Sequence, residues 1–169
     1  THELVYDVTD YQSLLHDSVE IEIFYQGWSS GFSATLDFDM IEGTPARNVM
    51  QLRNIYPQGG FTYRNSSTVE ANNLPPVNVP IDQNMIGAAL HVLPTGHGFN
   101  NSLNCAEFCN REYYVRIDGQ TTHTQSMWRD DCGLNPIYPQ GGTWLYDRAN
   151  WCPGAKAWTY EHNLTSYLT

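Results

Sequence analysis

Basic residues are scarce in this chain. Only 8 of its 169 residues are lysine or arginine, against 18 aspartates and glutamates, so the formal net charge is −10 at pH 7. The basic residues are scattered along the sequence and form no stripe. Such a charge balance repels phosphate backbones and anionic membrane surfaces, which makes nucleic acid and lipid poor partner candidates. A neutral polar ligand such as a sugar fits this composition better.

Long apolar runs are also missing. No stretch of about 18 apolar residues occurs, so the sequence predicts no membrane span. The chain opens on Thr1 without an initiator methionine, and no signal peptide is visible. The first 42 residues offer too few strands for an independent sheet, and the chain stops where another hairpin is due. We therefore expect a mature or excised piece of a longer protein, truncated at both ends.

The cysteines lack the spacing of a zinc site. Their separations are four, twenty-three and twenty residues, without a CxxC pair, which fits tetrahedral zinc poorly. Two disulfides are the better prediction, and four cysteines allow three pairings. Disulfides imply an oxidising compartment, so we expect a secreted, periplasmic or cell-surface protein. The four residues are Cys105, Cys109, Cys132 and Cys152.

Strand and turn formers dominate what is present. The chain is 41% hydrophobic and 13% aromatic, which is enough for a core and predicts an all-β fold. Apolar residues alternate at 19–23 and 32–40, with a hairpin loop at 26–31. Residues 7–15 predict a single helical turn with Thr9 or Asp10 as its N-cap. Residues 43–45 (Gly-Thr-Pro) predict a domain boundary, which divides the chain into residues 1–44 and 45–169.

Three further strands are predicted after this boundary. They cover residues 49–55, 86–93 and 113–117. Asp118 and Gly119 follow the third strand and are typical of a tight hairpin turn. Residues 127–154 are dense in Cys, Pro, Gly and Trp and are expected to form loops.

Glu107 is the first candidate functional residue. It lies between Cys105 and Cys109, with His97 earlier in the same region. A disulfide between these cysteines would close a small loop and hold the carboxylate in a fixed direction, as positioning an acid or acceptor requires. The alternative is a turn that carries a solvated glutamate. The cysteine bracket favours the functional interpretation.

A second group of candidates lies near Cys132 and Cys152. Trp144 and Trp151 can offer stacking faces to a sugar ring, and Arg148 can donate two hydrogen bonds to a carbonyl or hydroxyl pair. The alternative is that these residues pack around a Cys132–Cys152 disulfide. For Arg148, a further alternative is a simple local ion pair with Asp147.

Four irregular motifs in the second half resemble the C-terminal module of the peptide-N-glycosidase F family. They are NCAEFC (104–109), DDCGLNP (130–136), GGTW (141–144) and YDRANWCPG (146–154). DVTDYQSLL (7–15) and DFDMIEGTP (37–45) resemble the end of that family's N-terminal module. The resemblance implies two antiparallel jelly-roll β-sandwiches side by side, a fold shared with copper-dependent peptidylglycine monooxygenases. It also implies hydrolysis of the Asn–GlcNAc amide bond of N-glycoproteins, an N-glycan or glycopeptide partner, and no metal or cofactor.

The resemblance assigns roles to seven positions. Catalytic positions fall on Glu107 and Gln26, and substrate-binding positions on Arg148, Trp151, His97, Trp28 and Phe108. Gln26 replaces a glutamate, so it can orient a ligand but cannot take a proton. Phe108 replaces a tryptophan and loses its N–H. The family's water-activating aspartate is expected upstream of Thr1, so hydrolysis would need the remainder of the polypeptide or a larger assembly.

Two other functions compete with hydrolysis. A non-catalytic glycan- or protein-binding module on a larger secreted or surface protein agrees with Gln26 and with an aspartate outside the chain. A copper monooxygenase needs closely spaced histidine pairs with methionine, but no HxH or HH occurs. The available ligands would be His91, His97, His123, His162 and Met127. We predict no metal site.

Overall fold

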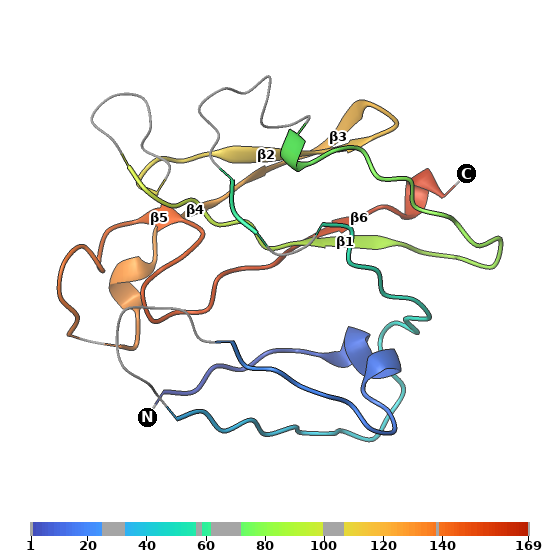
Figure 1. Cartoon of the computed structure of the whole chain (residues 1–169), viewed down its shortest axis with the longest axis horizontal. Coiled ribbons are helices and arrows are strands. Elements are labelled where there is room, and N and C mark those ends of the chain that lie inside the picture. The colour runs from blue at the N-terminus through green and yellow to red at the C-terminus, as the bar shows by residue number, and fades with distance from the viewer. Residues whose placement is uncertain are drawn as a thin grey trace. The chain divides into compact units, whose positions relative to one another are not determined.

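Strands dominate the regular structure of this chain. The computed structural model describes residues 2–24, 33–56, 59–61, 72–99, 107–137 and 139–168. Within these ranges the strands form antiparallel two-stranded pairs, and the helical segments are short: three 3-10 turns and the α-helical residues 72–73 (Figure 1). The predicted all-β class is confirmed, while the jelly-roll arrangement stays a prediction. Among the described residues, no helix has the length and apolar character that crossing a membrane requires.

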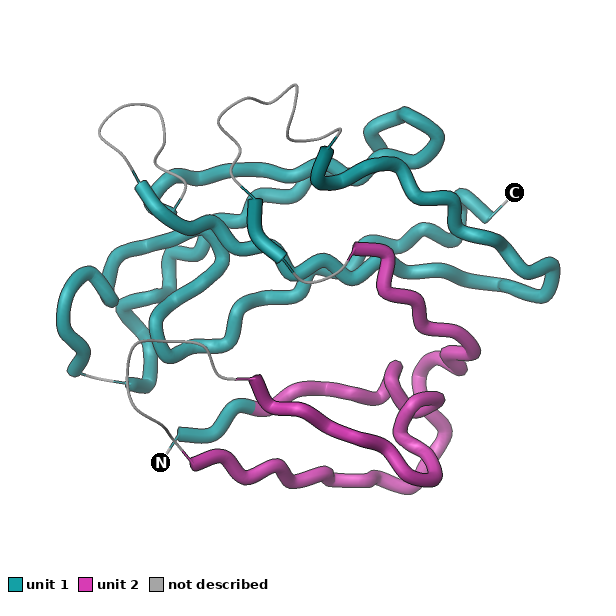
Figure 2. Tube along the Cα trace, in the orientation of Figure 1, with its two compact units in different colours: residues 1–4, 59–169 teal, residues 5–58 magenta. Residues whose placement is uncertain are grey.

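The chain divides into two compact units (Figure 2). Unit 1 comprises residues 1–4 and 59–169, and unit 2 comprises residues 5–58. The boundary predicted between residues 44 and 45 separates two modules of the sequence, whereas these units are defined by compactness. The predicted boundary therefore stays a prediction.

Unit 2 contains the predicted helical turn, but its cap differs from the prediction. The 3-10 helix η1 spans Thr9–Leu14. Asp7 Oδ1 accepts hydrogen bonds from the Thr9 N–H at 2.9 Å and from the Thr9 hydroxyl at 2.6 Å. Neither Thr9 nor Asp10 is the N-cap, because this Asx turn already starts the chain reversal two residues earlier. Asp10 instead accepts a 2.6 Å hydrogen bond from Arg47.

The strands predicted in unit 2 do not form among its described residues. Residues 19–24, 33–42 and 49–54 are extended or irregular without a ladder partner. Val19, Ile21 and Ile23, the apolar positions of the alternating pattern, are 46%, 47% and 53% exposed. Alternation specifies which face of a strand is apolar, whereas a strand also needs a neighbour to accept its hydrogen bonds. The predicted hairpin loop at 26–31 lies outside the described residues.

In unit 1 the predicted hairpin after residue 113 is confirmed. Strand β2 (Glu112–Ile117) pairs antiparallel with β3 (Gln120–Ser126). Asp118 and Gly119 connect them with φ values of 49° and 78°. Two consecutive positive φ angles match the right-handed twist of a hairpin, and Asp-Gly tolerates them. A register shift between Val115 and Arg116 bends β2.

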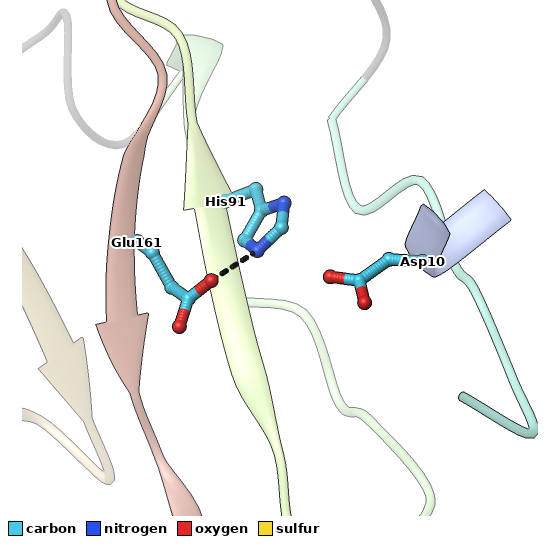
Figure 3. A group of neighbouring side chains, drawn as sticks. All are labelled: Asp10, His91 and Glu161. Carbon is cyan, nitrogen blue, oxygen red and sulfur yellow. Dashed lines mark hydrogen bonds and ion pairs between the residues drawn. The ribbon is translucent and has the colours of Figure 1, made fainter. Parts of the chain in front are cut away.

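The strand predicted at 86–93 is also confirmed. It is β1 (Ala89–Val92), which pairs antiparallel with β6 (Tyr160–Asn163). His91 lies directly opposite Glu161, and its Nε2 is 3.0 Å from the Glu161 Oε2 (Figure 3). Beyond the paired residues, η3 (Thr165–Tyr167) follows β6.

The core of unit 1 lies around a third pair of strands. Strands β4 (Trp128–Arg129) and β5 (Arg148–Ala149) interrupt the region predicted to be loops. Cys132, the first residue of η2 (Cys132–Leu134), forms a disulfide with Cys152, and both residues are buried. Closing this loop of about 20 residues stabilises the folded chain by about 3 kcal/mol in the loop-entropy account.

Cys109 is disulfide-bonded too, and no described cysteine is free. Cys105 lies outside the described residues, so its predicted pairing with Cys109 stays a prediction.

A cluster of tyrosine and histidine rings joins the two longer strand pairs. His162 on β6 is buried, and its Nε2 lies 2.6 Å from the Tyr113 hydroxyl on β2. The His123 ring on β3 lies 4.9 Å from the His162 ring, and Tyr160 and Tyr167 contact the same cluster. Burial lowers the pKa of His162 below its ordinary value of 6.5, and the neighbouring His123 lowers it further. Burial raises the pKa of Tyr113 to about 12, with a further contribution from Tyr160.

The free energy of unfolding is expected to fall on mild acidification because of His162. The unfolded chain binds a proton at this residue near pH 6.5, whereas the folded chain does so only at a lower pH. The contribution is therefore fully present above pH 6.5 and is lost as the pH falls below it. Urea unfolding of the wild type and of His162→Gln between pH 7.5 and 5 measures the difference. Equal pH dependence of the two proteins contradicts this expectation. His123→Gln, which removes one of the two causes, is expected to weaken the effect.

Candidate functional site

Backbone hydrogen bonds bring three distant segments together at Ala149, the last residue of β5. The Ala149 N–H donates to the Glu107 carbonyl at 2.9 Å, and the Ala149 carbonyl accepts from the Gly96 N–H at 3.0 Å. The Glu107 N–H in turn donates to the Gly98 carbonyl at 3.0 Å. Segments near residues 96–98, 107 and 149 are thereby held in register, although Ala149 follows Glu107 by about 40 residues.

Glu107 and Arg148 form a buried ion pair at this junction. Arg148 Nη1 donates to Glu107 Oε1, and the two side chains are only 3% and 14% exposed. The second carboxylate oxygen, Oε2, accepts a 3.3 Å hydrogen bond from the Gly98 N–H. Charge-assisted bonds of this kind fix the direction of a carboxylate. Arg148 therefore pairs with Glu107 rather than with its neighbour Asp147, which the sequence offered as an alternative ion-pair partner.

The rest of the Arg148 guanidinium is bound to the protein. Nη2 donates to the Thr143 carbonyl and, at 2.9 Å, to the Thr143 hydroxyl, and Nε donates to the Tyr146 carbonyl at 3.3 Å. Its Cζ lies 4.6 Å from the Trp151 ring centroid and 4.9 Å from the Phe108 ring centroid. A guanidinium held by several acceptors and two aromatic faces is rigid.

Trp151 connects this pair to the segment that carries His97. Its indole N–H donates to the Gly96 carbonyl at 2.8 Å, and its ring lies 5.0 Å from the His97 ring. The Nε2 of His97 is 2.8 Å from the Thr95 hydroxyl. His97 is exposed, whereas Trp151 is only partly exposed. Trp144 is the other tryptophan that the sequence offered for stacking on a sugar. It is buried, with 9% exposure, so it belongs to the core.

Phe108 makes two further aromatic contacts, with Phe99 and with Tyr146. Phe99 meets Phe108 edge-on at 5.5 Å, and Tyr146 does so at 6.3 Å. Phe99 and Tyr146 remain 68% and 53% exposed. Neither received a role from the sequence, although Tyr146 opens the motif YDRANWCPG, because exposure and ring contacts cannot be read from residue type.

A second buried arginine lies directly opposite the first. Arg129 on β4 faces Arg148 on β5 in the strand register. Like charges placed opposite each other destabilise a strand pair unless each is neutralised. Arg129 makes two 2.8 Å hydrogen bonds to Asp131 and one of 2.6 Å to the Lys156 carbonyl, and it stacks on Trp158. Its hydrogen bonds and charge hold the pKa of Asp131 below the ordinary value.

Asn150 is a structural residue that the sequence did not reveal. It is fully buried, and its φ of 59° lies in the left-handed region that asparagine tolerates better than most residues. Its side-chain N–H₂ donates to the carbonyls of Pro94 and Trp158 at 2.8 and 2.7 Å, and its Oδ1 accepts from the Trp158 N–H at 3.1 Å. Asn150 thus fixes the turn between Arg148 and Trp151. Asparagine is common in exposed loops, so its type alone gave no signal.

The structure brings together five of the seven residues assigned by resemblance. They are Glu107, Arg148, Trp151, His97 and Phe108. Gln26 and Trp28 lie outside the described residues. Two of the histidines that the sequence offered as metal ligands use a ring nitrogen in a hydrogen bond: His91 with Glu161, and His162 with the Tyr113 hydroxyl. The roles of the site residues stay predictions.

Fold and site together define an all-β unit with a disulfide and a buried glutamate–arginine pair flanked by aromatic rings. Comparison with known proteins agrees with this description. The family model "Peptide-N-glycosidase F, C terminal" matches residues 64–169. The chain is 30% identical over 175 residues to peptide-N(4)-(N-acetyl-beta-D-glucosaminyl)asparagine amidase F of Elizabethkingia miricola. That alignment covers 96% of this chain and 48% of the relative, so the chain spans about half the relative's length. No solved structure matches significantly.

This chain belongs to the peptide-N-glycosidase F family, and residues 64–169 match its C-terminal domain.

Breaking the Glu107–Arg148 pair is expected to destabilise the protein. Arg148→Met leaves a mostly buried carboxylate with one backbone donor, which costs about 3 kcal/mol of unfolding free energy. The double variant Glu107→Gln, Arg148→Met removes that charge and is expected to recover part of the loss. Urea unfolding of wild type, both single variants and the double variant measures the coupling. Strictly additive losses contradict a direct interaction.

Substitutions of Asn150 separate its side-chain bonds from its backbone conformation. Asn150→Gly keeps the left-handed conformation and loses three hydrogen bonds, for an expected loss of about 3 kcal/mol. Asn150→Ala loses the same bonds and adds backbone strain, so it is expected to cost about 1 kcal/mol more. Thermal or urea unfolding compares the two variants, and an alanine variant more stable than the glycine variant refutes the strain account.

Proposed function

We propose that the full-length protein hydrolyses the Asn–GlcNAc amide bond of N-glycoproteins or N-glycopeptides. The observation that carries this proposal is the Glu107 carboxylate, fixed by Arg148 and by the Gly98 N–H beside aromatic rings. Family membership and the name of the bacterial relative, an N-acetylglucosaminyl asparagine amidase, supply the substrate class.

Glu107 acts in this proposal as a fixed acceptor. An ionised carboxylate has about four lone-pair sites, and the bonds from Arg148 and from the Gly98 N–H use one on each oxygen. Since the side chain is 14% exposed, a lone pair remains available to an amide N–H or a sugar hydroxyl at the surface. A preorganised acceptor of this kind stabilises developing charge without rearrangement.

Arg148 acts through Glu107 rather than on the substrate. Four hydrogen bonds tie its guanidinium to Glu107, Thr143 and Tyr146, and the residue is 2% exposed. We assign it a positioning role, which differs from the substrate contact that the family resemblance implied.

The other site residues complete the proposal. Trp151, His97 and Phe108 contact the sugar, and Trp28 provides a further stacking face. Gln26 orients the ligand without exchanging a proton. The water-activating aspartate belongs to the remainder of the polypeptide. No cofactor is assigned.

Module boundaries and location form part of the same proposal. Residues 1–44 are the end of an N-terminal jelly roll, and residues 45–169 are most of the C-terminal one. The protein is secreted, periplasmic or displayed at the cell surface. The Cys132–Cys152 disulfide supports this location, because such bonds persist in oxidising compartments.

The alternative is a glycan-binding module without turnover. Gln26, in place of a family glutamate, favours it. The two functions share the aromatic residues and differ in whether the amide bond is cleaved.

Glycan release from a denatured N-glycoprotein by the full-length protein tests the proposal. Glu107→Gln keeps the shape of the side chain and removes its charge, so the rate is expected to fall about a hundredfold. Unfolding midpoints of both proteins serve as the control for folding.

Absence of release by the wild type at high enzyme concentration refutes hydrolysis. Glycopeptide binding that persists in that case, and that Trp151→Ala abolishes, identifies the binding module instead.

A further inference from the structure

Two exposed aromatic rings lie beside the Glu107–Arg148 pair without any assigned role. Phe99 and Tyr146 each meet Phe108 edge-on, and Phe108 itself lies over the Arg148 guanidinium. We call Phe99, Phe108 and Tyr146 the aromatic ledge. Its outer members are 68% and 53% exposed, although rings of this size usually bury most of their surface.

Arg148, one member of the Glu107–Arg148 pair, holds the aromatic ledge in place. Arg148 contacts the Phe108 ring at 4.9 Å and also bonds to the Tyr146 carbonyl at 3.3 Å. Edge-on contacts at 5.5 and 6.3 Å then orient Phe99 and Tyr146. Aromatic side chains have only two rotatable χ angles, so binding a ligand on them costs little conformational entropy.

Charge selects the class of ligand. The arginine closest to the ledge is buried and already neutralised by Glu107, and the whole chain carries a net charge of −10. Phosphorylated or acidic ligands are therefore disfavoured. A ligand suited to this surface presents a flat apolar face and neutral hydroxyl or acetamido groups, as a pyranose of the GlcNAc type does.

We propose that Phe99 and Tyr146 form a sugar-stacking subsite for GlcNAc residues next to Glu107. This subsite rests on the proposed function for its substrate class. It goes beyond that function in assigning roles to two residues to which neither the family resemblance nor the sequence gave one. Phe99→Tyr keeps a ring and is expected to keep binding.

Calorimetric titration of the full-length protein with N,N′-diacetylchitobiose tests the subsite. Phe99→Ala and Tyr146→Ala are each expected to weaken binding about tenfold, which corresponds to about 1.4 kcal/mol. Tyr146→Ala leaves the main-chain carbonyl that binds Arg148 in place. Tyr114→Ala is the matched control, since Tyr114 lies on β2 away from the ledge contacts and is 54% exposed, against 53% for Tyr146. This control is expected to bind as the wild type does.

The results distinguish the subsite from the hydrolase proposal. If chitobiose binding is weakened only in the ledge variants, the subsite is supported even when no glycan is released. Three results overturn the subsite. They are unchanged binding in both ledge variants, a loss of binding in Tyr114→Ala equal to that in the ledge variants, and no binding by the wild type at millimolar sugar. The hydrolase proposal survives any of those results if the full-length protein releases glycan.

Discussion

The buried guanidinium of Arg148 is the interaction on which the rest of the site depends. Its donors reach Glu107, Thr143 and Tyr146, and its face meets Phe108 and Trp151. One side chain therefore connects segments that β5 alone would leave apart. A planar cation with five N–H donors and two aromatic faces suits this task, and lysine could not replace it.

Burying a charge in a small unit is costly, and unit 1 offsets that cost locally. Arg148 is matched by Glu107, and the opposing Arg129 is matched by Asp131. The Cys132–Cys152 disulfide lies in the same core and limits the entropy of the unfolded chain. The core around β4 and β5 is thus specified by polar geometry and by a crosslink as much as by apolar burial. A buried ion pair by itself is weak support for stability, and it defines one arrangement of the loops.

The same geometry bears on function. Because Glu107 is held by Arg148 and by the Gly98 N–H, its direction does not depend on a ligand. The exposed aromatic ledge lies beside this fixed acceptor. A rigid acceptor next to exposed rings agrees with the proposed recognition of a sugar, because ligand sites combine apolar surface with a few placed polar groups. The proposed hydrolysis additionally relies on an aspartate that we assign to the remainder of the polypeptide.

The sequence by itself determined the elements that rest on local chemistry. Asp118-Gly119 specified a hairpin because few residues accept two positive φ angles. The irregular motifs around Glu107 and Arg148 identified the family, which the comparison confirmed. Alternation at residues 19–23 did not produce a strand among the described residues, because pairing needs a partner that no local pattern supplies.

Tertiary structure alone decided which side chains meet. Glu107 and Arg148 are 41 residues apart, and backbone hydrogen bonds at Ala149 hold their segments side by side. The hydrogen bond from Asn150 to the Pro94 carbonyl likewise joins residues that are 56 positions apart in sequence. Residue type sets what a side chain can donate, accept or stack on, whereas the long-range backbone path sets what lies within reach of it.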